Sequence, residues 1–427
     1  MTGRLLRRCD LTASVLFVLS ATIAWGTALE PAATVSYAGQ QVVRVTARTA
    51  KEVELIENMN LDVWNCFGPG IGTFDVRVTP KQLGQLADSG VLFEVVIDDV
   101  QQLVDFERVS IARAAQTGNG DWFQNFKSYQ DINDRLDFLT QSYPDLAEVT
   151  VIGQSLEGRD IRVIRVTGPD AIGNPRDGRP AFVIEGTQHA REWIAPMTVV
   201  FAADRLVQQY GLDARVQFVM EGVDFYFVPD MNPDGYDYTW TSERFWRKNR
   251  RINEGSSCQG IDLNRNWEVG WGGTGSSNDP CSDVFHGPQA WSEPEVAAVR
   301  DLTRSLSARL VAYLDFHSFG QLVLSPWQYT TTTPPDADFL DGYGQLISDA
   351  IRSVHGVHYQ SGQGSRILYI AAGTAHDWAY GERGAAAWGI ELRGAGFVLP
   401  PEQIIPTGEE NLEAILQICE SLLLGSP

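Results

Sequence analysis

Apolar and polar residues alternate along residues 40–97 in a pattern that predicts a small folded unit. A period of two predicts strands, a period near 3.6 predicts helices, and Thr79 suits the cap that begins the second helix. The strands are expected at 41–46, 61–64, 73–78 and 91–97, and the helices at 50–59 and 80–88. Their order is βαββαβ, the split pattern of ferredoxin-like α+β units.

From residue 122 onward, strand-like and helix-like stretches alternate without an internal repeat. The strands are expected at 149–152, 160–166, 181–186, 223–228, 310–316 and 385–392, and the helices at 129–142, 196–210, 293–306, 335–355 and 409–424. Some of these strands are short apolar runs, which are typical of strands buried on both faces. The pattern predicts an α/β domain with a mixed central β-sheet and helices on both faces.

The first residues have the pattern of a secretory signal peptide, which we expect at 1–28. A basic start is followed by the mostly apolar residues 11–25 and the small residues 26–28. The alternative is a membrane anchor, which needs about 20 apolar residues, and this run is shorter. No other stretch is long and apolar enough to cross a bilayer, so we expect a secreted protein without stable membrane association.

A polar, partly helical connector is expected at 98–120, between the two predicted units. It contains Arg113, a basic residue beside the Gly-containing tract 116–120. An exposed basic residue next to a flexible tract is a natural point of proteolytic cleavage. The alternative is an ordinary linker between domains. Cleavage at Arg113 would divide the mature chain into 29–113 and 114–427.

Charge narrows the class of partner. The chain has 427 residues, 44% of them hydrophobic, and a formal net charge of −21. Phosphate binding needs clustered Lys and Arg, so a nucleic acid partner is not expected.

The cysteines fit an exported protein, in which disulfides can form. Cys258 and Cys281 flank the Gly/Ser/Asn-rich stretch 270–279, and a bridge between them would hold that loop. We expect Cys419 to be a buried thiol, whereas Cys66 has no obvious partner.

The most informative stretch is the end of the apolar run 181–186, which His189 and Glu192 follow closely. Ligands bind at strand ends in open α/β sheets. An imidazole and a carboxylate supply two of the three protein ligands of a catalytic zinc site. We expect His317 as the third ligand, because it also follows an apolar strand. The competing histidines are His286, His355, His358 and His376.

Two carboxylates are candidates for roles around such a metal. Glu391 lies in the last predicted strand, and carboxylates are seldom placed in apolar strands unless they are paired or functional. It suits a general base that takes a proton from water, and its alternative is a buried ion pair with Arg393. Asp262 can accept the free N–H of a metal-bound imidazole.

Three arginines are candidates for contacts with a substrate. Arg265, beside Asn264, can hold a carboxylate through a bidentate pair. Arg247 can stabilise an oxyanion, and Arg191 can assist substrate entry from its place between the first two ligands. The alternative for each is a surface salt bridge, so these arginines gain weight only as a set.

These residues lie in motifs that resemble, from residue 40 onward, the secreted zinc carboxypeptidases of the carboxypeptidase A/B family, which are made with an N-terminal prosegment. The motifs are GTQHAREW at 186–193, NPDGY at 232–236, FWRK at 245–248, DLNRNW at 262–267, FHSF at 316–319, ILY at 367–369, IELR at 390–393, and LP at 399–400 with QIIP at 403–406. A single His-x-x-Glu occurs often by chance, whereas this whole set follows the order of the family.

The resemblance implies one Zn²⁺ per chain, bound by His189, Glu192 and His317. It implies that Glu391 is the general base for a metal-activated water and that Arg247 polarises the scissile carbonyl. The expected fold is then a zinc carboxypeptidase-like α/β domain behind a small ferredoxin-like prodomain.

The resemblance also implies roles for the substrate-binding residues, the cysteines and the N-terminal segment. The terminal carboxylate of the substrate would be bound by Asn264, Arg265 and Tyr369. Tyr369 belongs to a mobile loop in such enzymes, although spacing alone favours a core aromatic. Cys258 and Cys281 match a common disulfide of the family. Residues 29–113 correspond to the activation prosegment that covers the cleft until proteolysis removes it.

Departures from the family pattern bear on specificity. His376 stands where such enzymes have Ile if they prefer apolar C-termini, or Asp if they prefer Lys or Arg. Gly389 replaces a larger side chain of the pocket, and Phe319 replaces a common tyrosine. The candidate pocket positions carry no carboxylate; they include Gly364, Leu368, Thr374 and His376. We expect apolar or aromatic C-termini as substrates, with acidic ones as the alternative if His376 is protonated.

The sequence thus predicts a secreted, monomeric zymogen of a zinc exopeptidase. Its partners would be the C-termini of peptides or proteins and an activating endoprotease. Two alternatives are a zinc amidohydrolase of acyl-amino acids and a binding protein built on an inactivated peptidase fold. The complete set of predicted ligands, base and carboxylate-binding residues argues against both.

Overall fold

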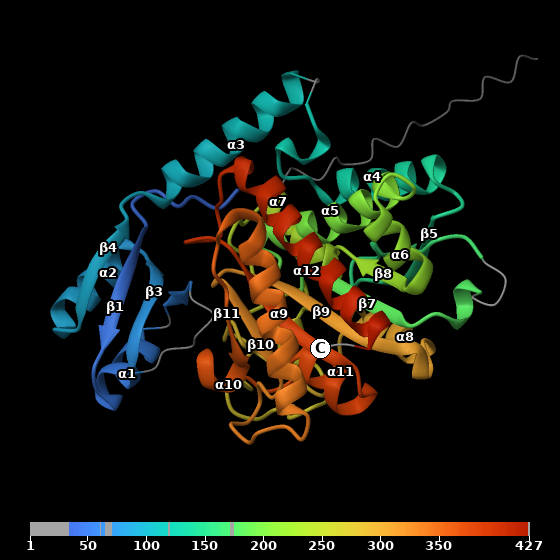
Figure 1. Cartoon of the computed structure of the whole chain (residues 1–427). Coiled ribbons are helices and arrows are strands. Elements are labelled where there is room, and N and C mark those ends of the chain that lie inside the picture. Colours follow the sequence, from blue (N-terminus) through green and yellow to red (C-terminus); the bar gives the residue numbers. More distant parts are fainter. Residues whose placement is uncertain (1–33, 60, 65–70, 118–119, 171–174, 426–427) are drawn as a thin grey trace, which may run out of the picture. The chain divides into compact units, whose positions relative to one another are not determined.

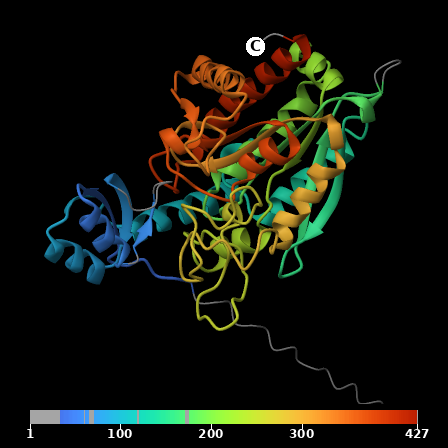
Figure 2. The ribbon, with the colours of Figure 1, turned by 90° about the horizontal axis from the view of Figure 1, so that it is seen from below.

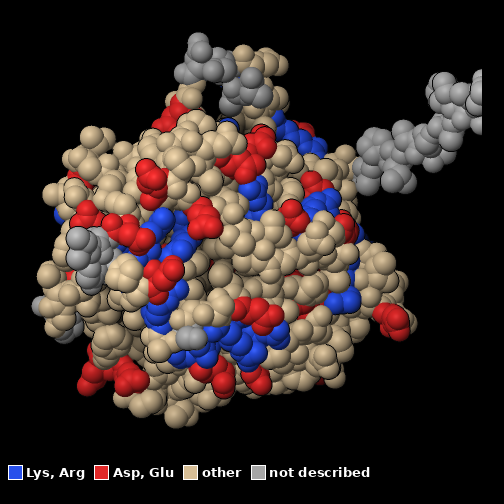
Figure 3. Space-filling model, turned by 90° about the vertical axis from the view of Figure 1, so that its right-hand side faces the viewer, with Lys and Arg blue, Asp and Glu red and all other residues tan. Residues whose placement is uncertain are grey.

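The computed structural model describes residues 34–425 apart from 60, 65–70, 118–119 and 171–174 (Figure 1). The predicted signal peptide, 1–28, and Cys66 lie outside the described residues. Among the helices in the described ranges, none has the length and hydrophobicity that a membrane span requires. On the face shown in Figure 3, Lys and Arg side chains are interleaved with Asp and Glu.

The N-terminal unit is a four-stranded antiparallel sheet with two helices, which confirms the predicted βαββαβ order. Its sheet has the strand order β2-β3-β1-β4. The elements are β1 (Gln41–Ala47), α1 (Ala50–Glu57), β2 (Asp62–Val63), β3 (Gly72–Val78), α2 (Pro80–Ser89) and β4 (Leu92–Ile97). Thr79 caps α2 as expected, because its side chain accepts from the Gln82 amide and the Gln82 side chain accepts in return. Alternate residues of β1, including Val43 and Val45, fill a core that belongs to this unit.

The connector differs from the prediction, because one continuous helix, α3 (Val100–Thr117), occupies most of it. Val100 and Val104 are buried and anchor the first turns. Arg113 is exposed, as expected, and lies on the last turns of this helix. Half of the residues of the helix are polar, and Val100, Val104 and Ile111, which recur at a helical spacing, are the signal of its packing.

The second sheet has eight strands in the order β11-β10-β12-β9-β7-β8-β6-β5. The strands are β5 (Ala147–Gln154), β6 (Asp160–Val166), β7 (Ala181–Gly186), β8 (Asp224–Val228), β9 (Leu310–Ser318), β10 (Leu322–Ser325), β11 (Gln360–Gln363) and β12 (Ala386–Leu392). The central strands β12, β9, β7 and β8 are parallel to one another. At one side, β6 runs antiparallel to β8, and β5 runs antiparallel to β6. The mixed sheet of the prediction is confirmed, and every residue of β7, β8 and β12 is buried.

Helices cover both faces of this sheet (Figure 2). The helices α5 (Ile194–Gln209), α9 (Ala337–His355) and α12 (Ile404–Leu424) pack against one another on one face. On β12 the side chain of Trp388 points to this face, because its indole donates to the Leu340 carbonyl of α9. The next residue, Gly389, faces α11 (Ala375–Arg383) on the other side, where α8 (Pro294–Ser305) also lies. Glu391 follows two residues later and therefore shares the face of Gly389.

Several elements were not predicted. They are β10, β11, α6 (Ala214–Gly222), α7 (Pro233–Thr241) and α11. The sequence of β11, Gln-Ser-Gly-Gln, has no apolar residue, and only its pairing with β10 makes it a strand. His376 is the second residue of α11, and His317 lies inside β9 rather than past its end.

Candidate metal centre and binding pocket

Three side chains converge at the end of β7 and β9: His189, Glu192 and His317 (the metal cluster). Their ligand atoms all lie within 4.8 Å of one another, and all three residues are buried. The Nδ1 atom of His189 is 2.9 Å from one Glu192 oxygen, and Nδ1 of His317 is 3.0 Å from the other. Although burial opposes it, the two imidazoles lower the pKa of Glu192, so this carboxylate stays charged. Two imidazoles and one carboxylate are the donor set of a catalytic zinc site.

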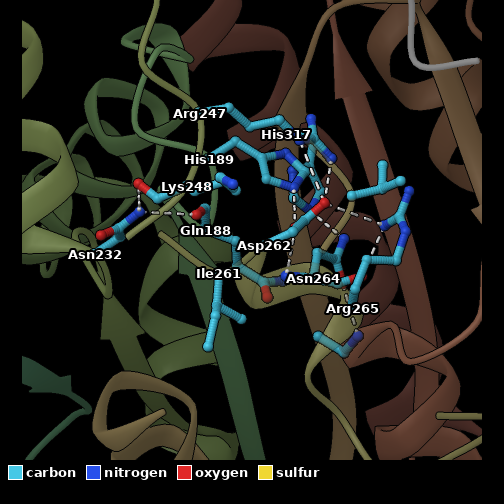
Figure 4. A network of polar contacts seen from close by, with 12 residues as sticks. Gln188, His189, Asn232, Arg247, Lys248, Ile261, Asp262, Asn264, Arg265 and His317 are labelled. Atoms are coloured by element: carbon cyan, nitrogen blue, oxygen red, sulfur yellow. Dashed lines mark hydrogen bonds and ion pairs between the residues drawn. The ribbon is translucent and has the colours of Figure 1, made fainter. Parts of the chain in front are cut away.

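The far nitrogen of each imidazole faces an acidic residue. Nε2 of His189 lies 3.1 Å from Asp262 Oδ1, the contact that was expected from the sequence (Figure 4). Nε2 of His317 lies 2.9 Å from Asp315 Oδ1 and 2.9 Å from the Asn264 amide nitrogen. A proton on Nε2 of His189 would leave Nδ1 free for a metal, so Asp262 fixes the tautomer and the ring orientation of that imidazole. At His317 the Asn264 amide nitrogen donates to Nε2 and so orients the ring, and the Asp315 carboxylate lies beside it.

Sequence reasoning did not assign a role to Asp315, although it lies two residues before His317. The signal was present, because a carboxylate in the apolar strand β9 meets the same criterion that selected Glu391. Asp315 is fully buried and lies opposite Glu185 in the β7–β9 register. Burial and the Asp315 carboxylate raise the pKa of Glu185 well above its usual range, and Tyr313 donates a 2.6 Å hydrogen bond to it. Two acidic residues thus share one buried layer behind the metal cluster.

Asp262 joins the metal cluster to the arginines. Its second oxygen accepts from Nη2 of Arg247 at 2.8 Å and lies 4.0 Å from Nη1 of Arg265 (Figure 4). Although burial opposes it, Arg247 and His189 hold the pKa of Asp262 well below its usual range. Asp262 is completely buried, and its charge compensates the two guanidinium groups at this edge of the sheet.

Arg265, Asn264 and Tyr369, which the resemblance implied as the residues that bind a terminal carboxylate, lie together (the candidate carboxylate-binding group, called the carboxylate-binding group below). Nη2 of Arg265 donates to the Tyr369 hydroxyl at 2.8 Å, and its other nitrogens donate to the carbonyls of Asn264 and Gly275. Asn264 is held by the Ala375 amide, which donates to its side-chain oxygen. These three residues line one pocket together with the metal cluster and Arg247.

Glu391 lines the same pocket and is buried. It lies directly opposite His317 in the β12–β9 register, so the two side chains are neighbours on one face of the sheet. The alternative of an ion pair between Glu391 and Arg393 is wrong. Arg393 instead pairs with Glu410 of α12 at 2.9 Å.

Arg191 is buried but is not one of the described residues that line the pocket. It donates to the Asp62 carboxylate at 2.8 Å and to the Val63 carbonyl at 3.0 Å, both in β2. A second buried arginine, Arg244, pairs in the same way with Glu107 of α3 at 2.6 Å. Asp62 and Glu107 both precede residue 113. Arg191 and Arg244 therefore bind the N-terminal segment while it is still attached to the chain.

The far end of the pocket is formed by five residues, which we call the side-chain pocket. They are Leu324, Gln328, Thr374, His376 and Gly389. Of the other expected positions, Leu368 lines the pocket, whereas Gly364 lies behind Gln328. Within the described chain, the only carboxylates that line this space are Glu192 and Glu391, which face the metal end. A basic substrate side chain would therefore meet no counter-charge at the far end.

The cysteines are placed as predicted where they are described. Cys258 and Cys281 form a disulfide, which closes the loop-rich segment between β8 and α8. Cys419 is a buried free thiol in α12, and burial raises its pKa well above its usual range.

The chain is similar to known proteins in sequence and in structure. The family models for zinc carboxypeptidase and for carboxypeptidase activation peptide match residues 132–414 and 43–107. The chain is 34% identical to carboxypeptidase A1 of Bos taurus over 406 residues, which cover 91% of this chain and 94% of that protein. It is 42% identical to carboxypeptidase B of Astacus astacus over 301 residues, 69% of this chain and 96% of that protein. Among solved structures, carboxypeptidase A of Helicoverpa armigera matches with a TM-score of 0.81 at 30% identity, covering 91% of this chain and 98% of that one.

Proposed function

The chain belongs to the zinc carboxypeptidase family, and we propose that it is an exopeptidase that removes single residues from the C-termini of peptides and proteins. The observation that carries this proposal is the pocket itself. One cavity is lined by a metal cluster, a buried carboxylate, an arginine beside the metal cluster and a second arginine with a tyrosine hydroxyl. An exopeptidase needs this combination, because it must bind a free carboxylate at a fixed distance from the reacting carbonyl.

The carboxylate-binding group selects the chain end. Arg265 donates to the Tyr369 hydroxyl, and a guanidinium can donate two parallel hydrogen bonds to a carboxylate. Asn264 adds an amide to the same wall of the pocket. An internal peptide bond or a C-terminal amide offers no negative charge to this group, which supports exopeptidase over endopeptidase action.

Bond cleavage is assigned to Glu391 and Arg247. His189, Glu192 and His317 would hold a zinc ion, which would polarise a carbonyl oxygen and lower the pKa of a bound water. Glu391 takes a proton from the attacking water and can return it to the leaving nitrogen. Arg247 donates to the carbonyl oxygen as negative charge develops there. Although burial opposes it, Asp262 raises the pKa of Arg247, so the guanidinium stays charged.

The chain carries an activation peptide and is therefore expected to be made as a zymogen. We assign residues 1–28 to a signal peptide, 29–113 to the prosegment and 114–427 to the secreted enzyme, with one zinc in a monomer. The exposure of Arg113 on α3 supports cleavage near that residue. Release of the prosegment would also free Arg191 from Asp62, and Arg191 could then contact substrate residues upstream of the cleaved bond.

The preferred substrates are proposed to lack a basic C-terminal side chain. The side-chain pocket has an apolar wall in Leu324 and offers no counter-charge at its far end among the described residues, which supports uncharged C-termini. An apolar or aromatic residue satisfies this condition.

The test is hydrolysis of a peptide set that varies only in its last residue, measured before and after limited trypsin treatment. Each peptide is supplied as the free acid and as the C-terminal amide, with and without a chelator. Release of the last residue from the free acids alone, dependent on trypsin and abolished by the chelator, is the expected result. Equal hydrolysis of the amides would refute recognition of the terminal carboxylate. Absence of any release from the processed, zinc-loaded protein would refute the exopeptidase.

A further inference from the structure

The side-chain pocket contains a buried imidazole whose nitrogen atoms are unpaired. His376 is 3% exposed, and neither of its ring nitrogens has a hydrogen-bond partner within the described residues. A neutral imidazole offers one N–H donor and one acceptor nitrogen. Leaving both buried without partners costs free energy, because water satisfied them in the unfolded chain. A ligand that enters this pocket can restore the lost hydrogen bonds.

The neighbouring carboxylates do not satisfy His376. The closer of the two is Asp377, whose Oδ1 lies 3.8 Å from Nε2, beyond hydrogen-bonding distance. The oxygens of Asp377 already accept from the backbone amides of Gln328 and Tyr329 at 2.8–2.9 Å. The second carboxylate, Asp315, faces His317. Asp377 therefore holds the loop of β10 in place, and the ring of His376 is left for the pocket.

The ring is neutral at physiological pH. Burial, with a smaller contribution from His317 and Arg265, lowers the pKa of His376 to about 4, although Asp315 opposes the shift. Bound zinc would add positive charge and so act in the same direction as Arg265. An acidic substrate side chain would thus meet an uncharged imidazole, which disfavours a C-terminal Asp or Glu.

Gly389 and Thr374 complete the surroundings of the imidazole. A Cβ atom at position 389 would lie 3.2 Å from Nδ1 of His376, so the absence of a side chain leaves room beside that buried nitrogen. The side-chain oxygen of Gln328 packs against Gly364, and its nitrogen donates to the Tyr369 carbonyl, so neither atom is offered to a ligand. The Thr374 hydroxyl is buried without a hydrogen-bond partner among the described residues. The pocket therefore presents the donor and the acceptor of the imidazole and one hydroxyl beside the apolar side chain of Leu324.

We propose that the side-chain pocket selects a C-terminal residue with a neutral hydrogen-bonding side chain, and that the carboxamides of Asn and Gln fit it best. A carboxamide has both an N–H₂ donor and a C=O acceptor, and it can therefore pair with the donor and the acceptors of this pocket at once. A purely apolar side chain would fill the space but would leave these polar atoms buried and unpaired. This inference rests on the proposed exopeptidase function and narrows its substrate class.

Three peptides that end in Asn, Leu or Asp test the proposal, because their last side chains have nearly the same size and shape. The full-length chain is loaded with zinc and processed with trypsin, and kcat/KM is measured for each free acid. We expect Asn to exceed both Leu and Asp on the order of tenfold, the value of one buried hydrogen bond to a satisfied partner. Faster cleavage after Leu would show an apolar pocket, and faster cleavage after Asp would show a charged imidazole. Either result would overturn the proposal and leave the exopeptidase intact.

Two variants assign the effect to the imidazole. His376→Leu removes the donor and the acceptor but keeps a side chain of similar bulk, and it should lower the Asn:Leu ratio of kcat/KM about tenfold. His376→Gln keeps a donor and an acceptor, and it should retain a ratio above one. The ratio is taken within each variant, so partial loss of folded or zinc-loaded protein cancels. An unchanged ratio in His376→Leu would overturn the role of His376, and if that variant does not fold, the wild-type ranking decides alone.

Discussion

The two ends of the pocket differ in how their polar groups are paired. At the metal end, Asp262 contacts His189 and Arg247, His317 contacts Glu192 and the Asn264 amide, and these pairs are internal to the protein. At the other end, both nitrogens of His376 are unpaired within the described chain. Both ends are buried to a similar degree, so burial does not explain the difference.

The difference separates two tasks. A group that holds a metal or moves a proton must keep one orientation and one charge through each turnover, and internal hydrogen bonds fix both. A group that reads a substrate must keep hydrogen-bonding capacity for that substrate, and its free energy is recovered only when the right ligand binds. At the pocket end, a buried polar atom without a partner thus indicates a contact with the substrate. At the metal end, the pattern of pairs indicates which groups must keep one orientation and one charge.

The largest effect is expected from Glu391→Gln, which removes the general base and keeps the size of the side chain. We expect kcat to fall on the order of a thousandfold, because general-base catalysis contributes about 10²–10⁴-fold. Zinc content and the affinity for a peptide that ends in a free carboxylate should stay near wild type, since neither contact involves Glu391. Turnover is measured on the processed enzyme, and zinc is measured by elemental analysis.

Glu185→Gln is the matched control for that variant. Glu185 is another buried glutamate of the same sheet and is not among the described pocket-lining residues. Its pKa is raised well above the usual range by burial and by Asp315, so a neutral glutamine resembles its protonated form. Its kcat should fall far less than that of Glu391→Gln. Equal losses in the two variants would mean that any disturbance of this layer stops catalysis, and Glu391 would lose its assignment as the base.

Arg265→Ala should give the next largest effect, and it should act on binding. Loss of a charged hydrogen-bond partner predicts a rise in KM on the order of a hundredfold for free-acid peptides, with a smaller change in kcat. Arg265→Lys keeps the charge but loses the paired geometry of the guanidinium, so its KM should lie between those of the wild type and Arg265→Ala. Arg251→Ala, which removes an arginine paired with Glu293, is the control for general destabilisation. An unchanged KM in Arg265→Ala would mean that another residue binds the terminus.

Local sequence patterns predicted most of the sheet and the metal end. The apolar run of β7 and the apolar stretch that leads to His317 predicted where the candidate ligands would lie, because a buried strand is defined by its own residues. The prediction failed where a partner far along the chain decides the structure. The ion pair between Arg191 and Asp62 joins residues 129 positions apart, and β11 forms only beside β10.

The pocket end was the hardest part to predict from the sequence. His376 was identified as a candidate through its place in a motif, but its helix, its burial and its unpaired nitrogens depend on α11 packing against Gly389 of β12. A single histidine in a sequence does not reveal whether it is exposed, paired or unpaired. The preference for apolar or aromatic C-termini followed from the absence of a counter-charge, whereas the hydrogen-bonding capacity of the pocket required the three-dimensional arrangement.

The smallest expected effect concerns pH, on which the preference between Asp and Asn should not depend through His376. Relative to His376→Gln, the Asp:Asn ratio of kcat/KM should stay constant from about pH 5.5 to pH 8.5, because burial lowers the pKa of His376 to about 4, below its usual value near 6.5. The imidazole is then neutral throughout this range, and it would gain a proton only in more acidic solution. The titratable and charged groups around it are Asp315, Asp377, Arg265 and the metal cluster, and the ratio cancels any effect of pH on Glu391. Burial raises the pKa of Asp377 to about 7, and its titration acts on the wild type and on His376→Gln alike, so the comparison with that variant removes it. A ratio that rises as the pH falls through 6.5, in the wild type and not in His376→Gln, would mean that the imidazole titrates normally and that the pocket end carries a charge like the metal end.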